Sequence, residues 1–226
     1  MSEARDSFAT IVNARRSVRA FLPDPVPDET LHQILHSARQ APSGANLQPG
    51  AFVQVRGLAR ERMSAELIAS FRAGTQEVED YAYFPTPMPS LLRRRQVAAA
   101  RALYGALGLE REDRAGRDGQ FERNFRFFDA PVALLVTIDR DFGSGGYMDL
   151  GMAIYGLMLA ASAQGLATCA IGAMASYPGL IRRSLGMEDK ETIVCGMALG
   201  YADVAAPVNA TVTGRCALNE YFRVID

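Results

Sequence analysis

The sequence has no surplus of positive charge and almost no lysine. Its 226 residues contain 24 Lys and Arg against 25 Asp and Glu, which gives a formal net charge of −1. We therefore expect no nucleic-acid partner and no acidic membrane surface as partner, because both usually require a large positive field. Lysine occurs only at Lys190, so a lone arginine carries little information here, whereas a group of arginines carries more.

Histidine and cysteine are scarce. The two histidines, His32 and His36, stand four residues apart in one helical pattern, where they could grip a metal ion. No third ligand is evident nearby, so we expect an exposed helix face and no metal site. The three cysteines, Cys169, Cys195 and Cys216, have no CxxC spacing and indicate neither a disulfide framework nor a zinc site. A Ser–His or Cys–His catalytic pair is not expected, and we name no catalytic side chain.

Several nucleotide and hydrolase motifs are missing. The stretch "TIDRDFGSGGYMDLG" resembles the opening of a dinucleotide fold, but Met148 stands where GxGxxG requires its third glycine. The acidic ribose partner expected about twenty residues later is absent as well. The sequence contains neither a P-loop GK(S/T) nor a GxSxG elbow. Phosphate binding, if present, must use other residues.

Neither the N-terminus nor the longest uncharged stretch predicts a membrane location. "MSEARDSFAT" carries charges and has no apolar core, so we do not expect a signal peptide. Residues 150–181 contain no charged side chain, but Ser162, Gln164 and Gly165 interrupt their apolar character. We expect a buried helix followed by a buried strand, no membrane partner, and a cytoplasmic protein.

Helical and strand patterns alternate along the chain. Helices are predicted over 5–14, 28–41, 58–72, 90–107, 147–164 and 178–186, and strands over 51–56, 130–139, 166–172 and 192–202. Helices and apolar strands in this order predict a single α+β domain with one mixed sheet. The charged residues 109–120 are expected to be a mobile surface segment, and residues 75–125 are expected to form an excursion from the domain. The C-terminal stretch from 207 onward has no strong period and predicts an extended tail.

Two short stretches suggest a binding function. In "RRSVRAF", an extended backbone would place Arg15, Ser17 and Arg19 on one face, where they suit a phosphate. A solvated charge run is an equally good interpretation of these residues. The second stretch, "APSGANLQPG" at 41–50, would expose backbone N–H groups and small polar side chains after a helix. Taken alone, it favours a helix-terminating turn.

Together these stretches resemble the nitroreductase family of FMN-dependent oxidoreductases. The same order of motifs continues with "RNFRFFDAPV" (123–132), "DLGMAIYGLMLAASAQGLATCAIG" (149–172), "LGYAD" (199–203) and the arginine of "VTGRCAL". The resemblance covers nearly the whole chain. It implies an α+β fold with a central, mostly antiparallel mixed sheet flanked by helices, in an intertwined homodimer whose interface holds FMN. The uncharged helix would lie in that interface, and a C-terminal arm at about 205–226 would embrace the partner.

The resemblance also implies site residues. One set of residues would bind the FMN phosphate and ribityl chain. Three further sets would contact the pyrimidine edge, the flavin ring and the region of N5. The implied residues are Arg15, Arg16, Ser17 and Arg215 at the phosphate end, Arg19 and Asn124 at the pyrimidine edge, Pro42, Ser43, Gly44 and Asn46 from the other subunit, and Gly172 and Ala173 beside N5.

The function implied is that of an FMN-dependent NAD(P)H oxidoreductase that reduces nitroaromatic or quinone acceptors. Since the flavin carries the chemistry, this scheme needs no protein acid or base. A related flavin enzyme is the first alternative: an enone reductase, a dehalogenase or an oxygen-using enzyme. Such an enzyme would use the 75–125 excursion, with Tyr81, Tyr83, Phe84 and Tyr104, as a lid. A non-catalytic flavin-binding protein is the second alternative.

Overall fold

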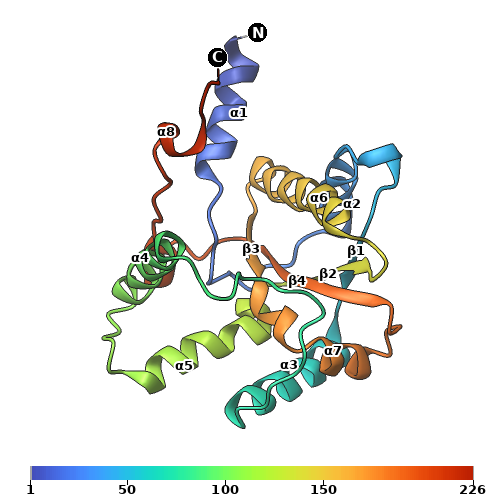
Figure 1. Cartoon of the computed structure of the whole chain (residues 1–226), viewed down its shortest axis with the longest axis vertical. Helices are drawn as coiled ribbons and strands as arrows, with labels where there is room; N and C mark the ends of the chain where they lie inside the picture. Colours follow the sequence, from blue (N-terminus) through green and yellow to red (C-terminus); the bar gives the residue numbers. More distant parts are fainter. Residues whose placement is uncertain (1, 226) are drawn as a thin grey trace.

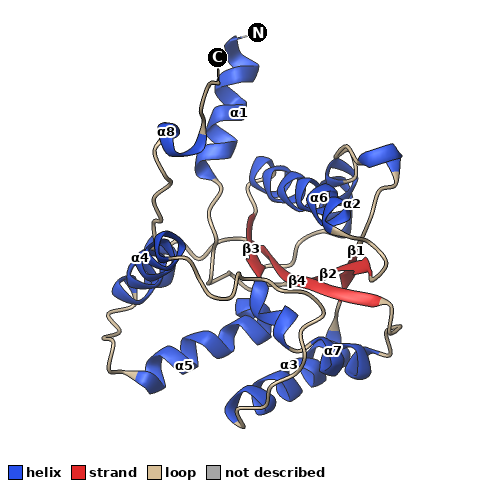
Figure 2. Ribbon diagram, in the orientation of Figure 1, coloured by secondary structure: helices blue, strands red, loops and turns tan. Residues whose placement is uncertain are grey.

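The fold centres on one antiparallel sheet of four strands (Figure 2). The computed structural model of the chain describes residues 2–225. The strands are β1 (Ala51–Gln54), β2 (Val132–Asp139), β3 (Ala167–Ile171) and β4 (Glu191–Gly200). They lie in the order β1-β2-β4-β3, and every neighbouring pair is antiparallel. The only parallel pairing among the described residues is an isolated bridge between Ser17 and Thr168.

Helices cover both faces of the sheet (Figure 1). Alternate residues of β2 enter two separate cores: Ala133 and Leu135 face one, while Leu134 and Val136 face the other. Both sides of this strand are therefore buried, which explains its continuous apolar run. The first core packs against α3 (Gly57–Arg72) and α7 (Pro178–Leu185), and the second packs against α2 (Asp28–Ala38) and α6 (Ser144–Ala163).

The remaining elements lie outside these layers. Figure 1 shows α1 and the C-terminal segment extending in the same direction away from the sheet, and α4 and α5 to one side of it. The C-terminal tail is mostly extended, as predicted, with two short helical turns. These elements are α1 (Ser2–Ala14), α4 (Ser90–Ala106), α5 (Arg114–Glu122), α8 (Leu218–Tyr221), and the 3-10 turns η1 (Gly44–Asn46), η2 (Arg123–Asp129), η3 (Gly172–Ser176) and η4 (Pro207–Ala210).

The uncharged stretch forms α6 and then β3, as the sequence predicted. No helix within residues 2–225 has the length and apolar character needed to cross a membrane. The prediction of a mobile surface segment over 109–120 is wrong for the part that forms α5. There the Asp113 carboxylate accepts the Gly116 N–H at 2.8 Å and caps the helix, and the ring of Phe121 stacks on Phe71 with centroids 5.0 Å apart.

Candidate cofactor-binding site

The arginine-rich stretch leaves α1 as an extended segment beside the edge strand β3. The Val18 N–H donates to the Thr168 carbonyl at 3.1 Å, and the Leu22 N–H donates to the Tyr201 carbonyl at 2.9 Å. These bonds hold residues 17–22 in strand-like geometry, in which side chains alternate. Ser17 and Arg19 therefore share a face, and Arg15, whose N–H donates to the Ile11 carbonyl at the end of α1, lines the same cleft.

This face forms one wall of a cleft of about 460 Å³. The extended C-terminal segment forms the opposite wall, and the end of α1 and one residue of α6 complete it. The cleft is lined by Val12, Asn13, Arg15, Arg16, Ser17, Arg19, Tyr155, Thr211, Val212, Thr213 and Arg215. The four residues expected at the phosphate end thus come together, with Arg19 beside them.

Every charged side chain in the cleft lining is an arginine. Within residues 2–225, no salt bridge joins Arg15, Arg16, Arg19 or Arg215 to a carboxylate. Arg19 donates to the Ser17 carbonyl at 3.3 Å, and Arg215 donates to Thr213 Oγ1 at 3.2 Å. Most guanidinium N–H groups remain available, and like charges gathered without a counter-ion favour a bound anion.

Sequence reasoning missed Thr211 and Thr213, which add two hydroxyl groups to the cleft. A signal for them exists, because 211, 213 and 215 alternate in an extended segment and end on the predicted Arg215. It also missed Tyr155 of α6, which carries no such signal.

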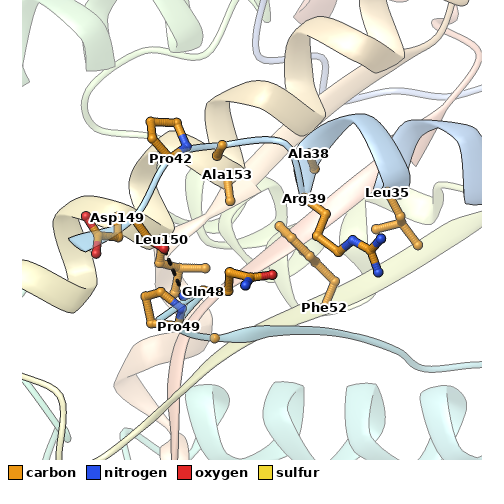
Figure 3. Close-up of a pocket in the computed structure, with 13 residues that line it drawn as sticks. Leu35, Ala38, Arg39, Pro42, Gln48, Pro49, Phe52, Asp149, Leu150 and Ala153 are labelled. Atoms are coloured by element: carbon orange, nitrogen blue, oxygen red, sulfur yellow. Dashed lines mark hydrogen bonds between the residues drawn. The ribbon is translucent and has the colours of Figure 1, made fainter. Parts of the chain in front are cut away.

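The loop after α2 lies at a different cavity, of about 280 Å³ (Figure 3). Pro42, Gln48 and Pro49 border it on the loop side, and Asp149 and Leu150 of α6 lie opposite them. The Gly44 N–H donates to Asp149 Oδ2 at 2.9 Å, and the Gln48 N–H donates to Ser43 Oγ at 2.9 Å. Asp149 therefore docks the loop onto α6, a role that the sequence did not indicate.

The backbone of this loop is strained. Ala45, Asn46 and Gln48 have φ values of 50°, 58° and 49°, in the left-handed region that side chains rarely adopt. Gly50 has φ 86°, and a Cβ there would lie 2.7 Å from both Leu150 Cδ1 and the Thr137 carbonyl. Gly44 and Asn46 are exposed in this loop.

The remaining expected residues lie at two further places. Asn124 is half-buried, and its Nδ2 donates to the Phe121 carbonyl at 2.7 Å. Gly172 and Ala173 begin η3 directly after β3. A Cβ on Gly172 would lie 3.0 Å from the Tyr83 ring, so the glycine lets this ring rest on the backbone. One chain thus brings the phosphate-end residues and Arg19 together but leaves the 42–46 loop at a separate cavity.

Neither buried cysteine near the sheet is a candidate nucleophile. Burial raises the pKa of the Cys169 thiol to about 11, against smaller opposing effects of Arg19, Arg15 and Ser17. Burial likewise raises the pKa of the Cys195 thiol to about 12. Both thiols stay protonated at neutral pH and lack the nucleophilic thiolate form. His32 and His36 lie exposed on α2.

Comparison with known proteins places this chain in a family. A model of the nitroreductase family matches residues 12–201. The chain is 36% identical over 210 residues to the 4-nitrobenzoate reductase of Pseudomonas putida. The aligned region covers 93% of this chain and 92% of that relative. The chain belongs to the nitroreductase family. The family match begins at residue 12, just before the arginine wall of the cleft, and ends before Arg215.

Two solved nitroreductases share the fold over their whole length. One is the FMN and NADPH-dependent nitroreductase NfnB from Sphigopyxis sp. strain HMH, with TM-score 0.93, 34% identity, and coverage of 97% of this chain and 99% of that one. The other is the FMN-dependent nitroreductase NfnB from Mycobacterium smegmatis in complex with NADPH, with TM-score 0.92, 30% identity, and coverage of 99% and 100%. The expected nitroreductase-like α+β fold is thereby confirmed.

Proposed function

We propose that this chain is an FMN-dependent NAD(P)H oxidoreductase that reduces nitroaromatic compounds. The observation that carries the proposal is a cleft lined by four arginines, by the aliphatic hydroxyl groups of Ser17, Thr211 and Thr213, and by no carboxylate. A phosphate monoester is a small, doubly charged anion that matches this set of donors. The names of the family's solved and curated members, which are FMN-dependent and act on nitroaromatic compounds, support the same conclusion.

Each wall of the cleft would have its own part in holding FMN. Arg15, Arg16, Ser17 and Arg215 would bind the phosphate. Arg19 would lie toward the pyrimidine edge, where a cation favours the anionic reduced flavin. When bound, FMN supplies the electron transfer between NAD(P)H and the acceptor, so the chain itself has to bind and orient rather than act as acid or base. Asn124, Gly172 and Ala173 would contribute to the ring side.

A homodimer would complete this site. Pro42, Ser43, Gly44 and Asn46 line or border a different cavity in one chain, so they would reach the ring from the partner subunit. On α6, Met148, Met152 and Tyr155 follow each other at helical spacing on the outward face and are 65%, 37% and 45% exposed. An apolar stripe of this kind on an interface helix needs a covering surface.

The segment 75–84 would act as a cover over the acceptor position. Tyr83 rests on Gly172, and its ring packs edge-on against Phe84 with centroids 4.8 Å apart. Burial raises the pKa of the Tyr83 phenol, so this ring offers a neutral hydroxyl at neutral pH. A planar aromatic acceptor entering beside Gly172 would meet this ring. We place the reaction in the cytoplasm, where NAD(P)H is available.

The colour of the purified protein tests the proposal. We expect a yellow protein that anaerobic NADPH or NADH bleaches, and that regains its colour when nitrofurazone is added. Menadione in place of nitrofurazone tests whether a quinone also reoxidises the reduced flavin. The rates of bleaching by NADH and NADPH at equal concentration show which one is the preferred electron donor. A yellow protein that neither nicotinamide bleaches would be a flavin-binding protein without turnover. A colourless protein that takes up no FMN would overturn the proposal.

A further inference from the structure

Asn209 joins the two walls of the arginine cleft. It lies in η4, two residues before Thr211, with which the C-terminal wall begins. Its Oδ1 accepts the Arg19 N–H at 2.8 Å. Its Nδ2 donates to the carbonyls of Ala20 and Asp203, also at 2.8 Å each. One half-buried side chain thus makes three short hydrogen bonds to the backbone of two segments far apart in the sequence.

The partners fix both the residue type and its orientation. An N–H and two carbonyl groups face the side chain, so it must present one acceptor and two donors. A primary amide is the neutral group that offers this combination. Glutamine would carry the same groups one methylene further out, and aspartate would set a carboxylate against two carbonyl oxygens. The amide orientation is therefore determined by its partners and not arbitrary.

The bond from the Arg19 N–H to Asn209 lies on the edge of the arginine segment that faces away from β3. Successive N–H groups of an extended chain point to opposite edges. The Val18 N–H donates to the Thr168 carbonyl of β3, while the Arg19 N–H donates to Asn209 Oδ1. The segment is thus held from both sides, by the sheet on one and by the C-terminal segment on the other. On the edge that carries the Val18 and Leu22 N–H groups, the Asp203 N–H donates to the Ala20 carbonyl at 3.0 Å and ties the segment to the chain that follows β4.

We propose that Asn209 is a positioning residue that sets the separation of the two cleft walls. Arg15, Ser17 and Arg19 lie on the wall that it bonds, and Arg215 lies on the wall that follows it in the chain. A fixed separation lets guanidinium groups from both walls contact a single phosphate. Asn209 lines the opposite side of the arginine segment and not the cleft itself, so it acts through these residues. The inference rests on the proposed FMN site.

The test compares FMN with riboflavin, which lacks the phosphate. Dissociation constants of both are measured by fluorescence quenching on the apoprotein of the full chain. For Asn209→Ala we expect the FMN constant to rise about tenfold, equivalent to the loss of one charge-assisted contact, while the riboflavin constant changes less than about threefold. Arg215→Ala shows the shift caused by direct loss of a phosphate contact. Asn219→Ala is the matched control, since it removes an exposed asparagine from the same segment.

A purely structural role would move the two constants together. Equal rises for FMN and riboflavin, or no rise in either, overturn the positioning role of Asn209. If the alanine variant does not fold, Asn209→Ser replaces it, because the serine hydroxyl can still bond one of the three partners. The dissociation constants of FMN and riboflavin are then compared in the same way. If the unaltered protein binds riboflavin as well as FMN, the phosphate assignment itself fails, and with it the proposed function. The two failures are therefore distinguishable.

Discussion

At the residue scale, the clearest feature is positive charge left without a partner. Some arginines elsewhere in the chain have a carboxylate partner: Arg72 donates to both Glu122 oxygens at 2.7 Å, which holds the pKa of that carboxyl below its usual range. Arg182 likewise donates to both carboxylate oxygens of Asp80. The arginines of the cleft have no such carboxylate within the described residues, and their mutual repulsion is relieved only when an anion binds.

We expect Arg15→Ala combined with Ser17→Ala to weaken FMN binding by at least about tenfold, because each lost contact to a charged group contributes roughly 1.5–3 kcal/mol. Isothermal titration of the apoprotein with FMN measures the loss. Arg94→Ala removes an exposed arginine of α4 and serves as the control. Unchanged FMN affinity in the double variant would show that the phosphate lies elsewhere.

Residues of the cleft could be predicted where a local pattern exists. Strand alternation places Ser17 and Arg19 on one face, but the family resemblance was needed to choose a phosphate site over a solvated charge run. Asn209 and Asp149 could not be predicted, because their partners lie 190 and 105 residues away in the sequence. Nothing in the residues around them records those contacts.

At the element scale, the segment before α4 has no regular structure but is firmly anchored. The Asp80 carboxylate accepts two bonds from Arg182, at 2.5 and 3.1 Å, and both side chains are nearly buried, at 9% and 12% exposure. Glu79 accepts from Ser176 Oγ at 2.9 Å, and Glu77 accepts from the Leu180 N–H at 3.1 Å. These contacts tie the segment to η3 and α7, which sets Tyr83 over Gly172.

We expect Asp80→Asn to lower the free energy of unfolding by about 3 kcal/mol, because it leaves the buried Arg182 guanidinium without its counter-charge. The Michaelis constant for a nitroaromatic acceptor should rise as the segment loosens, while FMN affinity stays unchanged. Urea denaturation and steady-state kinetics measure the two effects. Glu188→Gln removes an exposed partner of Lys190 and should cost less than about 1 kcal/mol. A fully stable Asp80→Asn variant would contradict this account.

Elements with a strong pattern were predictable, and those without one were not. The apolar runs of β2 and β4 and the uncharged stretch that forms most of α6 predicted the positions of these elements within a few residues. The turn into β2 gave no signal, since Phe127, Phe128 and Asp129 have φ values of 54°, 53° and 62° without a glycine among them. Arg60 holds this turn from outside, donating to the carbonyls of Ala130 and Arg126 at 2.7 and 2.9 Å. Tertiary contacts of this kind override local preference.

At the scale of the whole molecule, the residues expected around FMN fall at separate places in one chain. The arginine cleft and the 42–50 loop are separate, and apolar side chains remain exposed on α6 and along the C-terminal segment, where Leu218, Tyr221 and Phe222 are 73%, 84% and 62% exposed. Alternating elements were enough to predict an α+β domain. The expectation of a site shared by two subunits came from the family resemblance, because a sequence pattern within one chain does not show where a second chain lies.

We expect Met148→Glu combined with Met152→Glu to convert the protein into a monomer that holds no FMN. Both positions are solvent-exposed in one chain, so charge there should leave the fold of the chain intact. In a dimer the same carboxylates would be buried at the interface without partners, which costs several kcal/mol per charge. Light scattering after gel filtration gives the mass, and absorbance at the flavin band gives the FMN content.

Leu58→Glu, at an 82% exposed position on α3, should remain a dimer with full FMN content. A monomeric double variant that still binds FMN as tightly as the unaltered protein would mean that the arginine cleft alone holds the cofactor, and that the loop of the partner subunit has no part in the site.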